Sequence, residues 1–244
     1  MYTESQRFYR FQHQAVKGWT NFQVKFRETD LWIRARRNLQ REAAEAVLNC
    51  RLQLEQYISS HEDFLRSFSP LPDDPIAPPL VRRMLSASRI AGVGPMASVA
   101  GAIAQAVAVT LKPLSDSIIV ENGGDCYLDL EQETTVGIFA GPDSPFTGKI
   151  AVKLGPDRFP LGICTSSGTV GHSISFGKAD AVTILSPDAA LADAVATRLG
   201  NIVNTPADIA KALELAPTIP SIEGVLIVVK GKIGIWGNLE LTPT

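Results

Sequence analysis

The segment 162–201 constrains the fold of this chain more than any other part of its sequence. It joins an apolar run, a loop of glycine, serine and threonine, a second apolar run, and a helix with recognisable ends. Ser186 suits the N-cap of that helix, Pro187 suits its first turn, and Gly200 suits its C-terminal stop. The sequence therefore predicts a strand over 181–185, followed directly by a helix that ends near Gly200.

One face of this helix carries two oxygen ligands. Asp193 and Thr197 stand four residues apart and so share a face. A carboxylate beside a hydroxyl is a hard-oxygen pair suited to Mg²⁺ or Ca²⁺. The alternative is a solvated helix surface, which is the commoner reason for such a pair, and the spacing alone leaves both interpretations open.

Composition places the chain among ordinary globular proteins. Its 244 residues are 45% hydrophobic and 20% charged with a net charge of −2, which argues against nucleic-acid binding as a main task. Three widely spaced cysteines argue against a disulfide framework and for a reducing compartment. The first residues, MYTESQRFYRFQHQ, show no signal-peptide pattern, so we expect a cytoplasmic protein.

The stretch 90–111 is uncharged and long enough to cross a membrane. It is built from alanine, glycine and valine, contains Gln105, and carries Pro95 near its start. Alanine and glycine add little to insertion energy, and aromatic belts are missing. We therefore expect a close-packed core helix and no contact with a membrane.

The order of elements predicts an α+β fold with mixed or antiparallel sheets and packed helices, since regular βαβ alternation is missing. We expect one domain over 1–244, made of N-terminal strands and a long helix (1–68), a proline-rich loop (69–79) and a main body (80–244). The predicted strands are a pair within 9–37 turning at Lys17-Gly18, a hairpin over 117–130 turning at 122–125, single strands over 134–140, 149–155 and 161–166, and a closing hairpin over 224–241. The predicted helices cover 38–59, a short piece to Arg66, 80–91, a small-residue helix to Leu111, and one that opens with the capping-box variant at 205–208.

Three glycine-containing segments, 92–98, 121–125 and 165–168, bring backbone N–H groups near a helix start or a tight turn. Such groups bind anionic oxygens well. Each segment alone is weak evidence of a ligand site, because glycine in a turn is the usual case.

Taken in order, these segments resemble the ApbE superfamily of flavin transferases. The motifs that carry the resemblance are GVGPMASVAGAIA, ENGGD, TSSGTVGHS and KADAVTILSPDAALADAVAT, and they span most of 92–201. The run ETDLWIRA is also similar to a short cytoplasmic branch of ApbE-like proteins. The resemblance implies an ApbE-like fold.

The flavin transferases of this superfamily bind FAD, use a divalent metal to split its pyrophosphate, and pass FMN to a threonine of a target protein. The resemblance thus implies FAD and Mg²⁺ as ligands, and a protein acceptor as partner. It places Asp193 and Thr197 on the metal-binding Asp and Thr. Positions implied to line the nucleotide pocket are Gly94, Ala97 and Ser98 in the helix start, Gly123, Gly124 and Asp125 in the GGD turn, and Thr165, Ser166 and Gly168 in the Thr-Ser-Gly segment.

The sequence departs from the transferase pattern at two places. The transferases carry a lysine in the glycine-rich helix start, where Ser98 or a neighbour stands here. They also follow their histidine with Asp-Pro-x-Thr-Gly, whereas His172 is followed by SISFGKAD. His172 is a candidate acid/base or phosphate contact because its charge changes near neutral pH, and the alternative is a hydrogen-bonded loop histidine.

Two functions of different kinds follow from this resemblance. The first is an enzyme-like protein that holds a flavin nucleotide or similar phosphate ligand and performs Mg²⁺-assisted phosphate chemistry, with FMN transfer as its fullest form. The second is a non-catalytic accessory protein in cytoplasmic sulfur assimilation, since this branch has been linked to incorporation of sulfide into homocysteine. A third, unrelated small-molecule activity could reuse the same pocket.

Overall fold

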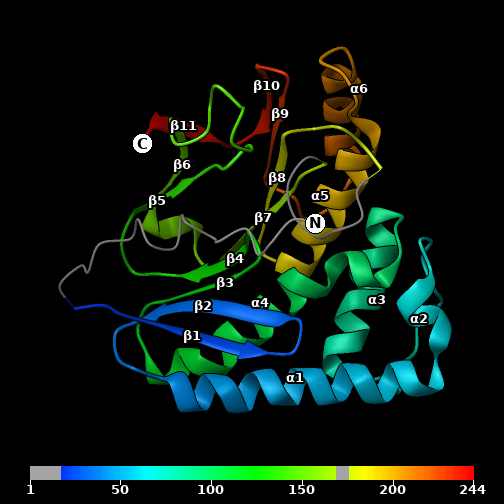
Figure 1. Cartoon of the computed structure of the whole chain (residues 1–244), viewed down its shortest axis with the longest axis vertical. Coiled ribbons are helices and arrows are strands. Elements are labelled where there is room, and N and C mark those ends of the chain that lie inside the picture. The colour runs from blue at the N-terminus through cyan, green and yellow to red at the C-terminus, as the bar shows by residue number, and fades with distance from the viewer. Residues whose placement is uncertain (1–17, 169–175) are drawn as a thin grey trace.

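The computed structural model describes residues 18–168 and 176–244, and a large antiparallel sheet organises them (Figure 1). This eight-stranded sheet has the order β1-β2-β3-β4-β7-β8-β9-β10. Its strands are Thr20–Phe26 (β1), Thr29–Ala35 (β2), Ile118–Asn122 (β3), Asp125–Asp129 (β4), Leu161–Ser166 (β7), Ala181–Ser186 (β8), Gly224–Val229 (β9) and Lys232–Gly237 (β10). A three-stranded sheet in the order β11-β6-β5 is formed by Glu240–Pro243 (β11), Ile150–Leu154 (β6) and Thr134–Gly137 (β5).

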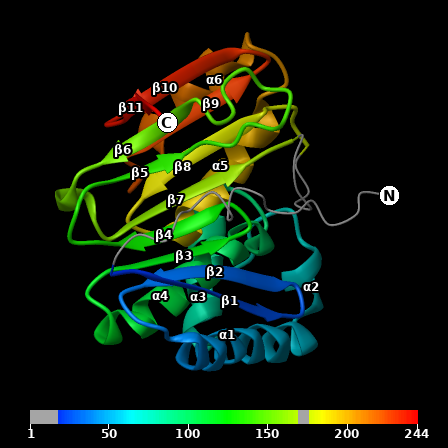
Figure 2. The same ribbon diagram turned by 60° about the vertical axis from the view of Figure 1, so that its left-hand side comes forward.

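Helices cover one face of the large sheet, as Figures 1 and 2 show together. They are Gln40–Ser60 (α1), Glu62–Arg66 (α2), Pro79–Ala91 (α3), Val99–Leu111 (α4), Ala189–Ile202 (α5) and Asp208–Leu215 (α6), and the short 3₁₀ turn Pro95–Ser98 (η2) precedes α4. One hydrophobic core lies between the sheet and these helices, and a second lies between the two sheets. The predicted α+β class, with antiparallel sheets and packed helices, is confirmed.

The first hairpin differs from the prediction in its turn. Phe26 pairs with Thr29, so the chain turns at Arg27-Glu28 rather than at Lys17-Gly18. In β1 the alternation buries Phe22 and Val24, and Phe26, the last residue before the turn, is exposed. The predicted strand residues before 18 lie outside the described part of the chain.

The start of α5 also differs from the prediction, because Asp188 and not Ser186 is its N-cap. The Asp188 carboxylate accepts hydrogen bonds from the N–H groups of Ala190 and Leu191. The Ser186 hydroxyl instead donates to the Ser221 carbonyl, at 2.7 Å. At the other end, α5 continues through the predicted stop at Gly200 to Ile202.

Asp188→Ala is expected to lower the free energy of unfolding by about 1 kcal/mol, because two amides at the helix start lose their acceptor. The measurement is chemical denaturation. Arg83→Gln is the control, since the Arg83 guanidinium lies 3.8 Å from the same carboxylate and both side chains are 41% exposed. Equal losses in the two variants would assign the effect to the ion pair instead of the cap.

The apolar stretch becomes a core helix, as the sequence predicts. Within the described residues, Pro95–Leu114 is the one helical stretch that is long and apolar enough to cross a membrane by length and composition. Its main part, α4, packs against α1, α5, β3 and β4. Its alanine and glycine residues let these elements approach closely, and one such close approach, at Gly101, lies beside the candidate site.

Candidate functional site

The N-terminal turn of α4 crosses α5 at Gly101. A Cβ atom added at Gly101 would lie 2.1 Å from the carbonyl oxygen of Ala189 and 3.0 Å from the Cβ of Asp193. The Asp193 carboxylate accepts a hydrogen bond of 2.9 Å from the Gly101 N–H. Glycine at this crossing therefore places a carboxylate of α5 on the amides that begin α4.

The GGD turn lies against the same turn of α4. Asn122 pairs with Asp125, and both intervening glycines have positive φ, at 70° for Gly123 and 108° for Gly124. Two consecutive positive φ values are typical of a type I′ hairpin, which explains the two glycines. The Asn122 amide donates to the Ala100 carbonyl at 3.2 Å, and this bond ties the hairpin to α4.

Asp125 connects this hairpin to the strand that ends in the Thr-Ser-Gly segment. Its buried carboxylate accepts a hydrogen bond of 3.2 Å from the Thr165 N–H of β7. The Thr165 hydroxyl is in turn 2.9 Å from the Thr183 hydroxyl of β8. Asp125, Thr165 and Asp193 thus come together from three segments that are far apart in the sequence.

The electrostatics of the site are dominated by two carboxyl groups without a cationic partner. Burial raises the pKa of Asp193 to about 7, although the N–H groups of Gly101 and Ala100 lower it. Burial and the neighbouring charge of Asp193 raise the pKa of Asp125 well above its ordinary value. Among the described residues, no lysine or arginine forms an ion pair with either group.

The chemistry of this donor set fits a hard divalent cation. Two carboxylates supply oxygen ligands, and Thr197 stands one helical turn after Asp193, half-buried. Within the described ranges no cluster of three or more His, Cys, Asp or Glu side chains could hold a metal. A cation here would therefore complete its shell from hydroxyl, backbone, water or ligand oxygens.

Two of the backbone amides that the sequence predicts as phosphate ligands are already engaged. The Thr165 N–H donates to Asp125, and the Gly124 N–H donates to Glu121 at 2.8 Å. Like the Gly101 N–H on Asp193, each of them serves a carboxylate of the chain itself. The expectation that such amides would cradle an anion directly is thus not met at Gly124 and Thr165.

In the helix start, local packing explains the residues that the resemblance implies would line the pocket. A Cβ atom at Gly94 would lie 1.8 Å from the Ser67 carbonyl oxygen, so glycine there permits close contact with the chain after α2. The Ser98 hydroxyl is buried and donates to the Pro95 carbonyl at 2.7 Å. Ala97 is half-buried in the same turn.

In the Thr-Ser-Gly segment, Ser166 is buried at the end of β7, opposite Val182. The Gly168 N–H donates to the Ala179 carbonyl at 2.9 Å. His172, the candidate acid/base, lies within 169–175 and so outside the described residues.

Sequence reasoning missed the roles of Gly101, Asn122 and Thr183. An isolated glycine inside an alanine-rich helix is a recognised sign of close packing, so Gly101 could have been identified. Asn122 and Thr183 act through contacts between elements, and no local pattern reports those.

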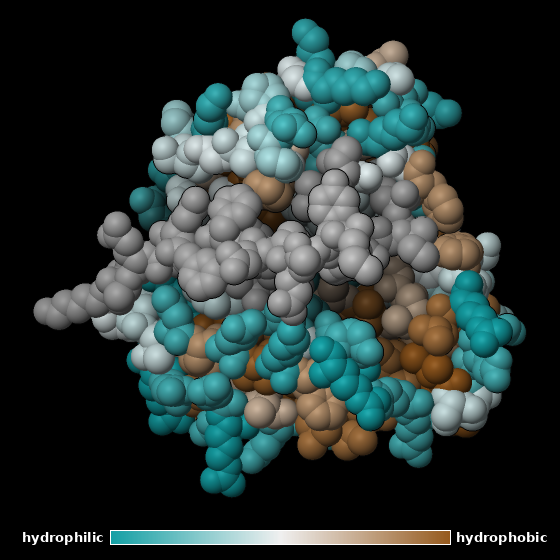
Figure 3. Space-filling model, viewed as in Figure 1, coloured by the Kyte–Doolittle hydropathy of each residue, from teal (hydrophilic) through white to brown (hydrophobic). Residues whose placement is uncertain are grey.

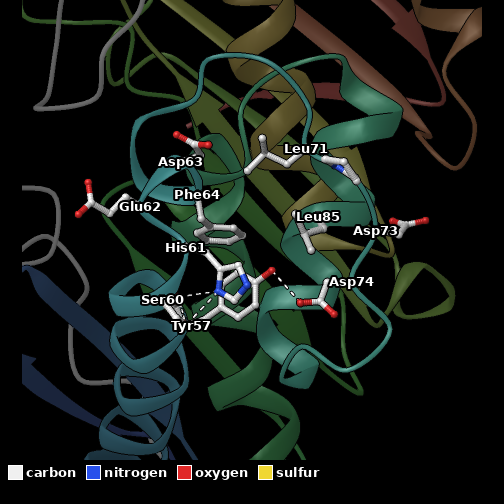
Figure 4. Close-up of a pocket in the computed structure, with 11 residues that line it drawn as sticks. Tyr57, Ser60, His61, Glu62, Asp63, Phe64, Leu71, Asp73, Asp74 and Leu85 are labelled. Carbon is white, nitrogen blue, oxygen red and sulfur yellow. Dashed lines mark hydrogen bonds between the residues drawn. The ribbon is translucent and has the colours of Figure 1, made fainter.

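A cavity of about 460 Å³ lies elsewhere, between the end of α1, α2 and the proline-rich loop. Figure 4 shows the rings of Tyr57 and His61 stacked at its floor, and the Tyr57 hydroxyl donates to Asp74 at 3.0 Å. Hydrophobic surface gathers over α2 and α3 beside it (Figure 3). Tyr57 and Asp74 satisfy one another, and the carboxylates of Glu62 and Asp63 point away from the ring stack. The chemistry therefore favours the Asp125–Asp193 site.

A family model described as AbpE bacteria matches residues 12–232. A UPF0280 protein of Methanocaldococcus jannaschii is 41% identical over 233 residues, covering 93% of this chain and 94% of that protein. A UPF0280 protein of Archaeoglobus fulgidus is 38% identical over 228 residues, with coverages of 89% and 92%.

Two solved structures are similar to the whole described fold. The flavinyl transferase ApbE of Pseudomonas stutzeri superimposes with a TM-score of 0.58 at 15% identity, covering 93% of this chain and 94% of that chain. The ApbE protein of Thermotoga maritima superimposes with a TM-score of 0.55 at 13% identity, with coverages of 88% and 96%. At these identities the likeness shows the fold alone.

Proposed function

We propose that this chain, which belongs to the AbpE bacteria family within the ApbE-like superfamily, binds a flavin nucleotide or a similar phosphate ligand through a divalent cation. Asp193 and Thr197 would hold Mg²⁺, with Asp125 beside them. The fullest form of the activity is FMN transfer from FAD to a protein acceptor in the cytoplasm. When bound, Mg²⁺ would neutralise phosphate charge and stabilise the departing oxygen.

The observation that carries this proposal is the pair Asp125 and Asp193. Each carboxylate is fixed by a backbone amide, so neither can turn away from the other without losing a hydrogen bond. Their raised pKa values mean that ionising both carboxyls is unfavourable in this buried place, which offers no protein cation within the described residues. A divalent cation relieves that repulsion, and side chains held in advance lose little entropy on binding it.

The hydrogen bonds that three backbone amides already make render the proposal more specific. Because the amides of Gly101, Gly124 and Thr165 serve the chain's own carboxylates, they leave a phosphate group without these direct donors. The phosphate must then be attracted by the cation. Binding of FAD should therefore require Mg²⁺, whereas a backbone cradle would bind FAD or pyrophosphate without it.

The test is the melting temperature of the full chain with Mg²⁺ alone, FAD alone, and both together, in buffer freed of metals by EDTA before Mg²⁺ is added. A ligand at a hundredfold excess over its Kd stabilises by about 2.7 kcal/mol, which raises Tm by about 5–10 °C in a chain of this size. We expect that shift only with both ligands present. Asp193→Asn should remove it, and Asp116→Asn, which changes an exposed carboxylate, should keep it.

An equal FAD shift without Mg²⁺, or a full shift in Asp193→Asn, would overturn the proposal. The accessory role in sulfur assimilation makes the opposite prediction. It expects no shift with either ligand, and a sulfur-metabolism protein that co-purifies with the chain. Both functions are thus separated by one set of melting curves and one affinity purification.

A further inference from the structure

Two arginines share one tryptophan ring on the opposite face of the large sheet from the helices. The guanidinium carbons of Arg34 and Arg36 lie 5.0 Å and 4.3 Å from the ring centroid of Trp19. Thr20 pairs with Ala35, so Trp19 precedes the strand pair directly across from Arg36. Ala35 is buried in the core between sheet and helices, so its neighbours on β2 face the other way.

These two charges have no counter-charge in the described part of the chain. Neither Arg34 nor Arg36 forms an ion pair there, and both guanidinium groups lie against the Trp19 ring. The Nε atom of Arg34 is buried without any hydrogen-bond partner. A buried donor left unsatisfied is costly, so its retention calls for an acceptor.

The surroundings of Arg34 explain why its charge is poorly solvated. Arg34 pairs with Ile119, which pairs with Leu128, and both belong to the core between the two sheets. Burial, followed by the nearby charge of Arg36, lowers the pKa of Arg34 from its ordinary value. An anion placed at these two residues would meet concentrated, weakly screened positive charge.

We propose that Arg34 and Arg36 form a binding site for a phosphate or sulfate group. Residues two apart on one strand project side by side, about 6.6–6.8 Å apart, and guanidinium forks match the oxygens of a tetrahedral anion. Contact with Trp19 holds both forks in place. Two positive charges match a dianion. This site does not depend on the proposed function, because it lies on the face of the sheet away from Asp193.

The test is phosphate titration of the full chain at constant ionic strength, followed by tryptophan fluorescence and by calorimetry. Saturable binding is expected in the unchanged chain. Arg34→Gln and Arg36→Gln should each weaken it at least tenfold, since each removes a charge-assisted contact. Arg41→Gln is the matched control, because Arg41 is an exposed arginine of α1 paired with Glu45.

The remaining arms identify the source of the anion and protect against a folding artefact. Competition by AMP would show that the phosphate group of a nucleotide is accepted, and binding of inorganic phosphate alone would indicate the free ion. Melting curves should show Arg34→Gln as stable as the unchanged chain, since a buried unpaired charge is removed. Trp19→Phe should reduce the fluorescence response, leaving only what Trp32 reports from the same face of β2, while calorimetry still detects binding.

Two results would overturn the proposal. They are an absence of saturable phosphate binding in the unchanged chain and unchanged affinity in both arginine variants.

Discussion

Gly101→Ala is expected to lower the free energy of unfolding by about 3 kcal/mol, the upper part of the range for overpacking a close contact. The added methyl group would stand 2.1 Å from the Ala189 carbonyl oxygen, which is backbone and cannot rotate away. The two helices must separate, and α5 also packs against β7 and β8, so the strain reaches the sheet. In a chain of this size the loss corresponds to a fall in Tm of about 6–12 °C.

Gly137→Ala is the matched control, measured by the same urea denaturation. It adds the same methyl group to β5, where the nearest atom, Cγ2 of Thr244, is 3.9 Å away. Its effect should stay below about 1 kcal/mol. If both glycine variants lose the same stability, the crossing at Gly101 is looser than the distances state. Because the crossing also seats Asp193, Gly101→Ala should in addition weaken any response to Mg²⁺.

Elements with strong local signals were predictable from the sequence. The helix at 40–60 has a long amphipathic run, and the hairpin at 118–129 has two glycines at its turn. The start of α5 shows where local reasoning fails. Ser186 and Asp188 are both good N-caps two residues apart, and the choice between them is decided by the contact of Ser186 with Ser221. That contact joins segments far apart in the chain.

Strand order was not predictable in the same way. β4 pairs with β7 in the large sheet, while β5 and β6 leave it to form the smaller one with β11. Pairing of this kind depends on which apolar faces meet, and alternation within one strand does not report it. The sequence predicts a closing hairpin that includes Glu240 and Leu241, yet the strand Glu240–Pro243 pairs with β6.

In the candidate site, too, the sequence predicts some features, and others depend on contacts between distant segments. Spacing and family resemblance selected Asp125 and Asp193, and the structure brings them together with Thr165. Neither signal could report that the amides of Gly101 and Thr165 would serve these carboxylates, since those bonds exist only after the helices and the sheet have packed. The expected anion cradle thus becomes a pair of fixed acids.

The charge of these fixed acids should make stability depend on pH in an unusual direction. The folded pKa of Asp193, about 7, lies above the value of about 3.9 for an unfolded aspartate. Between these values the folded chain binds the proton more tightly, so this group's contribution is fully present below about pH 4 and is lost as pH rises through 7. Without Mg²⁺, urea denaturation should therefore show this contribution falling from pH 4 to 7.5.

Asp125→Asn should remove the part of the pH dependence that Asp125 itself adds, because burial and the charge of Asp193 raise the pKa of Asp125, while in the variant an amide oxygen remains to accept from Thr165. At pH 8 without metal the variant should be more stable than the unchanged chain. Asp193 is half-buried, and the solvent that reaches it screens part of the repulsion, so the gain is expected to be about 1 kcal/mol. Asp116→Asn, on the exposed surface, should keep the original slope.

Added Mg²⁺ distinguishes a binding site from a structural acid pair. Protons and Mg²⁺ compete for the same oxygens, so stabilisation of the unchanged chain by Mg²⁺ should grow from pH 5.5 to pH 8. Asp125→Asn should show a weaker response to Mg²⁺ together with higher stability in its absence. If the two acids were only structural, Asp125→Asn would raise the stability without Mg²⁺ and leave the response to Mg²⁺ unchanged. A binding site whose charges lower the stability of the free protein must show both the weaker response to Mg²⁺ and the higher stability without it.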